Sequence, residues 1–127
     1  MNLEHIAINI PDVRAAAQWY ANNLDMRIVL SANQPPYMHF LADNKGSMME
    51  FYSRTDVAPP DYQSLNPFNL HLAFQVDDIV GKRDALIRAG ASLEDDITPT
   101  SVGDQLAFLR DPWGVPLQLV KRNKALE

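Results

Sequence analysis

The sequence contains no cysteine, and this absence excludes disulfide scaffolds, thiolate nucleophiles and zinc sites built from thiolates. It also lacks any run of lysine or arginine. Its 11 basic and 16 acidic side chains give a formal charge of −5, which argues against nucleic acid as a partner. No apolar run approaches the length of a membrane span, and the first residues lack the pattern of a signal peptide. We therefore expect a cytoplasmic protein whose partner is neither a membrane nor a nucleic acid.

What remains is the composition of an ordinary globular domain. Apolar residues make up 46% of the chain and charged residues 21%, so a hydrophobic core is expected beneath a charged surface. A length of 127 residues is enough for one such domain and too short for two independent ones.

The chain contains an internal repeat, which has to be found before individual elements are assigned. Residues 3–13 read LEHIAINIPDV and residues 69–79 read NLHLAFQVDDI. With an offset of 66 residues, His5 aligns with His71, Asp12 aligns with Asp78, and the apolar alternation matches. Chance does not readily produce all three matches together. We interpret the chain as two copies of one unit of about 60 residues.

Each copy predicts the element order βαβββ. An alternating strand comes first, and a helix follows that Asp12 can cap in one copy and Asp77 or Asp78 in the other, with Gly90 ending the second helix. Three strand-like segments then follow, near 26–32, 36–42 and 47–53 in the first copy and near 91–97, 104–110 and 115–121 in the second. The predicted organisation is module one at 1–53, a proline-containing linker at 54–67, module two at 68–122 and a tail at 123–127.

Each copy also presents one histidine and one oxygen donor. Side chains alternate across a strand, so His5 lies on the face opposite the isoleucines that a helix would cover, and His71 does the same in the second copy. The last strand of each copy adds Glu50 and Gln118, which follow their histidines by 45 and 47 residues. Repetition at matched positions therefore distinguishes these four residues from isolated polar residues on strands.

Two histidines and two oxygen donors on two matched units can converge on a pseudo-two-fold axis, and this predicts a metal site. The donor set suits one divalent ion among Zn²⁺, Ni²⁺, Co²⁺, Mn²⁺ and Fe²⁺ rather than Ca²⁺. Taken singly, each residue is more often structural, because a strand histidine or glutamate usually faces solvent or a satisfied polar contact. The third histidine, His39, has no counterpart in the repeat, and we interpret it as structural.

Paired βαβββ modules with this order of His, Glu, His and Gln resemble the vicinal oxygen chelate superfamily, which includes glyoxalase I, bleomycin-resistance proteins and extradiol dioxygenases. The sharpest local match is DPWGVPLQL at 111–119, which is similar to the family ending DP-x-G-N-x-x-E-L. The resemblance implies an α+β fold in which two modules form one eight-stranded, cup-shaped mixed sheet, and a homodimer as the common state. It implies one divalent metal ion as cofactor, with the ligands His5, Glu50, His71 and Gln118.

The sequence departs from the family pattern at Gln118, where glyoxalase I and methylmalonyl-CoA epimerase have glutamate. In isomerase-type reactions a carboxylate near the metal removes a proton from a carbon beside a carbonyl, and an amide cannot do this. Glu50, or water at the metal, is then the candidate catalytic base. With one carboxylate the site would carry a net charge of +1, which should weaken metal binding and strengthen polarisation of a bound oxygen.

These observations predict a metal-dependent enzyme of the lyase or isomerase type that acts on a small oxygen-chelating metabolite. Two alternatives stay open. His5, Glu50 and His71 are the ligand types of Fe(II) enzymes, which indicates an extradiol-type dioxygenase. The cup could instead bind a small molecule without reaction, as bleomycin-resistance proteins do, or hold its metal only for structure.

Overall fold

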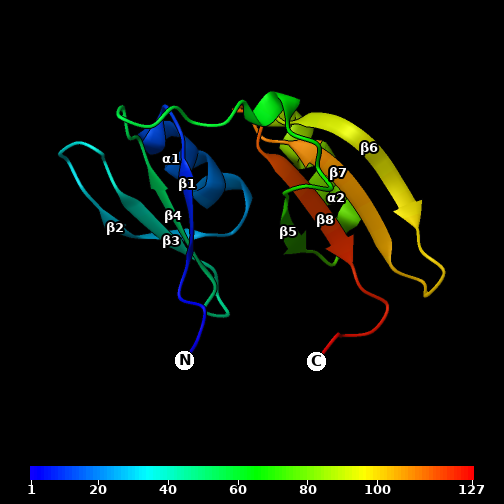
Figure 1. Ribbon diagram of the computed structural model, residues 1–127. Helices are drawn as coiled ribbons and strands as arrows, with labels where there is room; N and C mark the ends of the chain where they lie inside the picture. The colour runs from blue at the N-terminus through cyan, green and yellow to red at the C-terminus, as the bar shows by residue number, and fades with distance from the viewer. The chain divides into compact units, whose positions relative to one another are not determined.

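The computed structural model describes residues 1–127, and the chain divides into two compact units, Met1–Pro60 and Asp61–Glu127. We call these the first half and the second half. Each contains one four-stranded sheet and one α-helix (Figure 1). No helix of the chain has the length and apolar character needed to cross a membrane.

The first half contains five elements: β1 (Ile6–Asn9), α1 (Val13–Asn23), β2 (Arg27–Ser31), β3 (His39–Ala42) and β4 (Met48–Tyr52). Its strand order is β1-β4-β3-β2, with β1 parallel to β4 and the other neighbours antiparallel. Helix α1 connects β1 to β2 at the opposite edge of the sheet, and two antiparallel turns then bring β4 beside β1. The sheet is therefore mixed, with β1 and β4 parallel.

The second half repeats this topology after a short 3-10 turn at Tyr62–Ser64. Its elements are β5 (Leu72–Gln75), α2 (Ile79–Arg88), β6 (Ser92–Pro99), β7 (Gln105–Arg110) and β8 (Pro116–Lys121). The strand order is β5-β8-β7-β6, again with one parallel pair. The predicted α+β class and the βαβββ repeat are confirmed, with the eight strands arranged as two four-stranded mixed sheets.

Both helices begin where an aspartate caps them. The side chain of Asp12 accepts a hydrogen bond from the backbone N–H of Ala15 at 3.2 Å, and Asp78 accepts one from Gly81 at 3.0 Å. Of the two candidates for the second cap, Asp78 is therefore the cap. Helix α2 ends before Gly90, whose φ of +107° lies in the left-handed region that glycine adopts without strain.

One face of each sheet lies in the hydrophobic core, and the predicted donors Glu50 and Gln118 lie on the other face. In β4, Phe51 is fully buried while Glu50 between the apolar neighbours is only half-buried; in β8, Leu117 and Leu119 are fully buried while Gln118 is half-buried. The ring of Tyr20 from α1 packs edge-on against Phe51, with centroids 4.9 Å apart. This alternation is the one that the sequence predicts.

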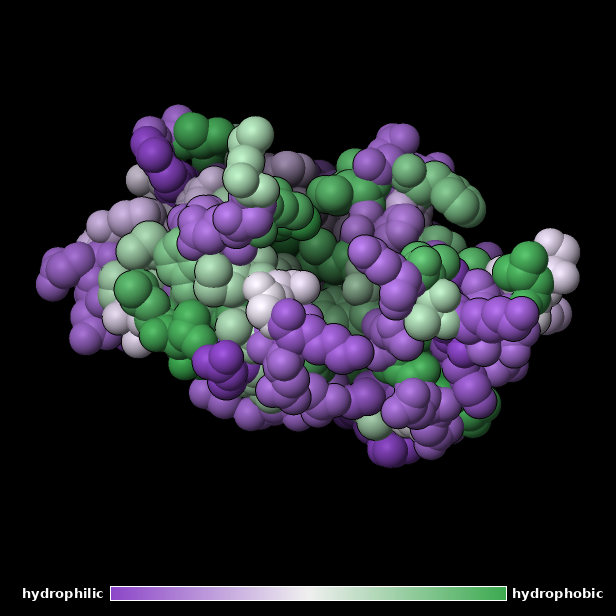
Figure 2. All heavy atoms as spheres, turned by 90° about the horizontal axis from the view of Figure 1, so that it is seen from below, coloured by the Kyte–Doolittle hydropathy of each residue, from purple (hydrophilic) through white to green (hydrophobic).

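One expectation about the core is wrong. Ile8 and Ile10 are buried as predicted, but Ile6 is 47% exposed because it begins β1, the edge strand of its sheet. Apolar residues appear among hydrophilic ones on the surface of both halves (Figure 2). The most exposed large apolar residues include Leu3 and Phe68.

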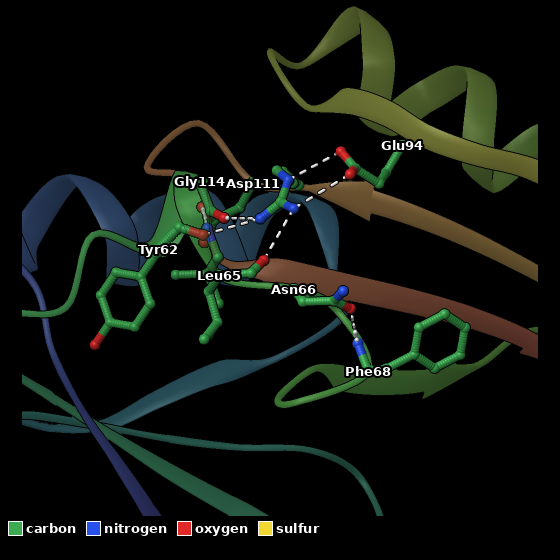
Figure 3. A network of polar contacts seen from close by, with 9 residues as sticks. Tyr62, Leu65, Asn66, Phe68, Glu94, Asp111 and Gly114 are labelled. Carbon is green, nitrogen blue, oxygen red and sulfur yellow. Dashed lines mark hydrogen bonds and ion pairs between the residues drawn. The ribbon is translucent and has the colours of Figure 1, made fainter.

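The segment predicted as a linker is divided between the two halves. In the first half, the side chain of Asn9 accepts the backbone N–H of Arg54 and donates to the carbonyl of Val57. In the second half, the guanidinium of Arg110 donates to the carbonyls of Tyr62 and Leu65 (Figure 3). Residues 54–60 and 61–67 are thus each hydrogen-bonded to their own half.

Candidate metal centre

The first half brings His5 and Glu50 together. His5 directly precedes β1, and Glu50 lies on the neighbouring strand β4, opposite Ala7 in the register. Nε2 of His5 is 3.2 Å from Oε2 of Glu50, and the two side chains are 29% and 15% exposed. Two ligand atoms that each lie about 2.1 Å from one ion are about 3.0–3.4 Å apart at octahedral to tetrahedral angles. The observed separation falls within that range, so this pair fits adjacent positions around a divalent ion.

The other ring nitrogen of His5 has an unusual environment. Nδ1 is buried and makes no hydrogen bond, although it lies 3.2 Å from Oε2 of Glu4. The imidazole therefore lies between two carboxylates, Glu4 beside Nδ1 and Glu50 beside Nε2.

An aromatic ring packs against this histidine. Phe40 on β3 lies opposite Glu50 in the register, and its ring meets the imidazole of His5 edge to face, with centroids 5.0 Å apart and planes at 82°. Such contacts favour one orientation of both rings.

The second half repeats this arrangement at the equivalent positions. His71 directly precedes β5, and Gln118 lies on β8 opposite Ala73. Phe108 on β7 lies opposite Gln118, and its ring meets the imidazole of His71 edge to face, with centroids 5.3 Å apart and planes at 85°. Each half therefore holds a histidine, a small residue, a phenylalanine and an oxygen donor in one pattern.

The backbone determines which nitrogen of His71 carries the proton. Nδ1 lies 2.7 Å from the carbonyl oxygen of Pro67. A carbonyl can only accept, so Nδ1 donates, and Nε2 of the neutral ring keeps a free lone pair. This is the form in which histidine binds metal ions through Nε2.

Sequence comparison assigns the family. A model described as "Glyoxalase/Bleomycin resistance protein/Dioxygenase superfamily" matches residues 2–119. The chain belongs to this superfamily. It is 23% identical over 126 residues to lactoylglutathione lyase of Haemophilus influenzae, in a match that covers 95% of this chain and 93% of the relative.

Solved structures of other proteins show the same fold. A glyoxalase family protein from Bacillus cereus superposes with a TM-score of 0.82 at 16% identity, over 95% of this chain and 93% of that one. An antibiotic binding protein from a Streptomyces species superposes with a TM-score of 0.74 at 16% identity, over 97% of both chains. The fold therefore occurs in proteins described as glyoxalases and in one described as a binder, so it does not decide the activity.

Each half contains two of the four predicted ligands. His5 and Glu50 are in direct contact in the first half, while His71 and Gln118 lie on neighbouring segments of the second half. No group of three or more His, Asp or Glu side chains of the chain is gathered closely enough to hold a metal ion. The four-ligand set stays a prediction.

Sequence reasoning did not place several of the residues that lie against the two histidines. Phe40 and Phe108 are separated by the same 68 residues as Glu50 and Gln118, so extending the repeat to the third strand would have found them. Glu4 gave no such signal, because the repeat has an apolar leucine at the matching position. The third histidine, His39, lies opposite Phe51 on the core side of the sheet and is buried, and its Nδ1 lies 2.7 Å from the carbonyl of Tyr37.

Proposed function

We propose that the protein is a metal-dependent enzyme of the lyase or isomerase type, with one divalent ion held by His5, Glu50, His71 and Gln118. The observation that carries this proposal is the 3.2 Å separation of His5 Nε2 and Glu50 Oε2 in the first half. Zinc, nickel, cobalt, manganese and iron(II) all accept this mixture of nitrogen and oxygen donors.

Two further observations support the ligand set. His71 already has its proton on Nδ1 because of the Pro67 carbonyl, so Nε2 is available. The two phenylalanines hold the two imidazoles in matching edge-to-face contacts, as expected if both rings serve one purpose.

The substrate that fits this centre is a small metabolite with a carbonyl and a neighbouring oxygen. A bound divalent ion polarises such oxygens and makes the adjacent C–H more acidic. Glu50 is the only carboxylate among the four residues, so it is the group that accepts the proton. Gln118 offers an amide oxygen that binds a cation but takes no proton at neutral pH. The relative named lactoylglutathione lyase supports the lyase class.

The test is the metal content of protein purified without a tag or chelator, measured by elemental mass spectrometry. We expect about one equivalent in the unmodified protein and none in a His5→Ala/His71→Ala variant. The matched control is His39→Gln, which removes the remaining histidine and leaves the metal content unchanged, since its amide can still donate to the Tyr37 carbonyl.

The outcomes separate the alternatives. Nickel, cobalt or zinc would favour the lyase or isomerase class. Iron would favour an extradiol-type dioxygenase, because two histidines and one carboxylate leave positions open for O₂ and substrate. No metal after reconstitution with each candidate ion would contradict the enzyme and favour a small-molecule binder, the property named for the antibiotic binding protein of the same fold.

We also propose a cytoplasmic homodimer whose partner is a small-molecule substrate. The homodimer is the state that the superfamily resemblance implies. Sedimentation analysis at several protein concentrations tests it, and a monomer at every concentration would contradict it.

A further inference from the structure

Glu4 lies beside a nitrogen that the structure leaves without a hydrogen bond. Oε2 of Glu4 is 3.2 Å from Nδ1 of His5, and Nδ1 is buried and unpartnered. A buried polar atom without a partner is unfavourable, and such atoms are rare in folded proteins. A buried nitrogen that lies beside a carboxylate without a hydrogen bond to it needs an explanation.

Metal binding through Nε2 supplies that explanation. A histidine that binds a cation through Nε2 carries its proton on Nδ1, and this N–H normally donates to a carboxylate or a carbonyl. In the second half the acceptor is the carbonyl of Pro67, 2.7 Å from Nδ1 of His71. In the first half the acceptor beside Nδ1 of His5 is the carboxylate of Glu4 at 3.2 Å.

We propose that Glu4 is a positioning residue of the metal centre: its carboxylate accepts the Nδ1–H of His5 when Nε2 binds a divalent cation. The inference rests on the proposed function. It also addresses the charge left by Gln118, because a divalent ion with Glu50 as its only anionic ligand carries a net charge of +1. The carboxylate of Glu4, one ring away, balances that charge.

The exposure of Glu4 sets how strongly its loss should weaken metal binding. Loss of the acceptor that orients a ligand histidine typically weakens metal binding 10–100-fold. Glu4 is 63% exposed, so water screens its charge, and we expect the lower end of that range. Salt should reduce the effect further, because an exposed charge is screened over about 10 Å at 0.1 M ionic strength.

The experiment measures Zn²⁺ affinity by competition with a chromophoric chelator. We expect Glu4→Ala, which removes both the acceptor and its charge, to bind Zn²⁺ about tenfold more weakly than the unmodified protein at low salt, with a smaller difference at about 0.5 M salt. The matched control is Asp77→Ala, which removes the same charge from an exposed residue after β5. It should change the affinity less than twofold.

A second readout follows the ring itself. In ¹⁵N NMR of the Zn²⁺-loaded protein, the Nδ1 proton of His5 should be observed, and Glu4→Ala should accelerate its exchange with water. A merely structural contribution of Glu4 to folding would not change this one proton selectively.

The outcomes distinguish this inference from the proposed function. If His5→Ala abolishes Zn²⁺ binding while Glu4→Ala matches the unmodified protein, the inference about Glu4 is wrong and the metal site stands. An equal loss in Glu4→Ala and Asp77→Ala would also overturn it, because net charge alone would then explain the effect. If His5→Ala leaves Zn²⁺ binding unchanged, the metal site itself is wrong.

Discussion

Replacing Arg110 with methionine should destabilise the second half more than any other loss of a single arginine. Arg110 ends β7 and is only 4% exposed. Its guanidinium donates to both carboxylate oxygens of Glu94 at 2.9 and 3.2 Å. It also donates to three carbonyls, those of Tyr62 at 2.9 Å, Leu65 at 3.0 Å and Gly114 at 3.2 Å (Figure 3). One side chain thus connects β6, the turn before β8 and the segment that precedes β5.

The expected loss can be estimated contact by contact. Methionine fills much of the space of the arginine stem but donates no hydrogen bond, so three carbonyls lose a charged donor. That of Tyr62 still accepts the backbone N–H of Leu65 at 3.1 Å, whereas those of Leu65 and Gly114 lose the donor that the guanidinium supplied. An unsatisfied buried acceptor costs about 1–3 kcal/mol, and the lower end applies where water can reach it. Glu94 is 40% exposed, so water replaces the guanidinium there at little cost. We expect a loss of about 3 kcal/mol in the free energy of unfolding of Arg110→Met.

Urea unfolding followed by circular dichroism measures this loss. The control is Arg83→Met, which also removes an arginine paired with two carboxylates, Asp84 at 3.0 Å and Asp96 at 2.9 Å. Arg83 lies on the surface of α2, where solvent screens both pairs, so its loss should have a much smaller effect. If the two variants lose the same stability, the reasoning about buried carbonyls is refuted.

Further predictions address the metal centre, the turn before β8 and pH. Gln118→Glu should raise Zn²⁺ affinity at least about tenfold, because an anionic oxygen would replace a neutral amide oxygen in direct contact with the ion; an unchanged affinity in chelator competition would count against Gln118 as a ligand. Gly114→Ala should lower the free energy of unfolding by about 3 kcal/mol, because φ is +91° and the new Cβ would lie 2.8 Å from the backbone nitrogen of Gln63. Gly46→Ala, with φ of +98° and open space around it, should lose less in the same urea experiment, and equal losses would contradict the contact. The neighbouring guanidinium holds the pKa of Glu94 below its ordinary value. The ionised Glu94 carboxylate contributes its full stabilisation above the unfolded-state pKa of about 4.3, and this contribution is lost as pH falls through the lowered folded-state pKa. Glu94→Gln should therefore flatten the decline in the free energy of unfolding between about pH 5 and pH 3, and an unchanged slope would rule this out.

The sequence predicted the parts of the fold that depend on local signals. The aspartate caps at Asp12 and Asp78 and the alternation around Glu50 and Gln118 are local, because a cap bonds three residues ahead and a strand alternates at every residue. The exposure of Ile6 was missed because it depends on which strand lies at the edge of the sheet, and strand order is not encoded locally.

The arrangement of the segment before β5 could not be predicted for a related reason. Arg110 binds Tyr62 across 48 residues and Glu94 across 16 residues. An arginine in a sequence is most often at the surface, so nothing in its immediate neighbours signals burial. Only the folded sheet brings the carbonyls of this segment within reach of the guanidinium.

Within the candidate centre, the repeat predicted which side chains share a face but not how the imidazoles are oriented. The 3.2 Å contact of His5 and Glu50 agrees with the matched spacing in the sequence. The acceptor beside Nδ1 of His71 is a backbone carbonyl, that of Pro67, and any residue at that position would present the same group. A contact made by the backbone leaves no trace in the amino-acid pattern.

The two halves use one backbone design and differ in charge at the candidate centre. Glu50 corresponds to Gln118, and Glu4 corresponds to Leu70, so both carboxylates near the histidines come from the first half. Each half needs its own helix cap and its own buried strand face, because each half folds around its own core. One divalent ion needs compensating charge only once, and a second pair of carboxylates would overcompensate it and add repulsion among the acidic groups. The positions that match between the two halves therefore specify the fold of each half, whereas the positions that differ determine the charge proposed around the metal.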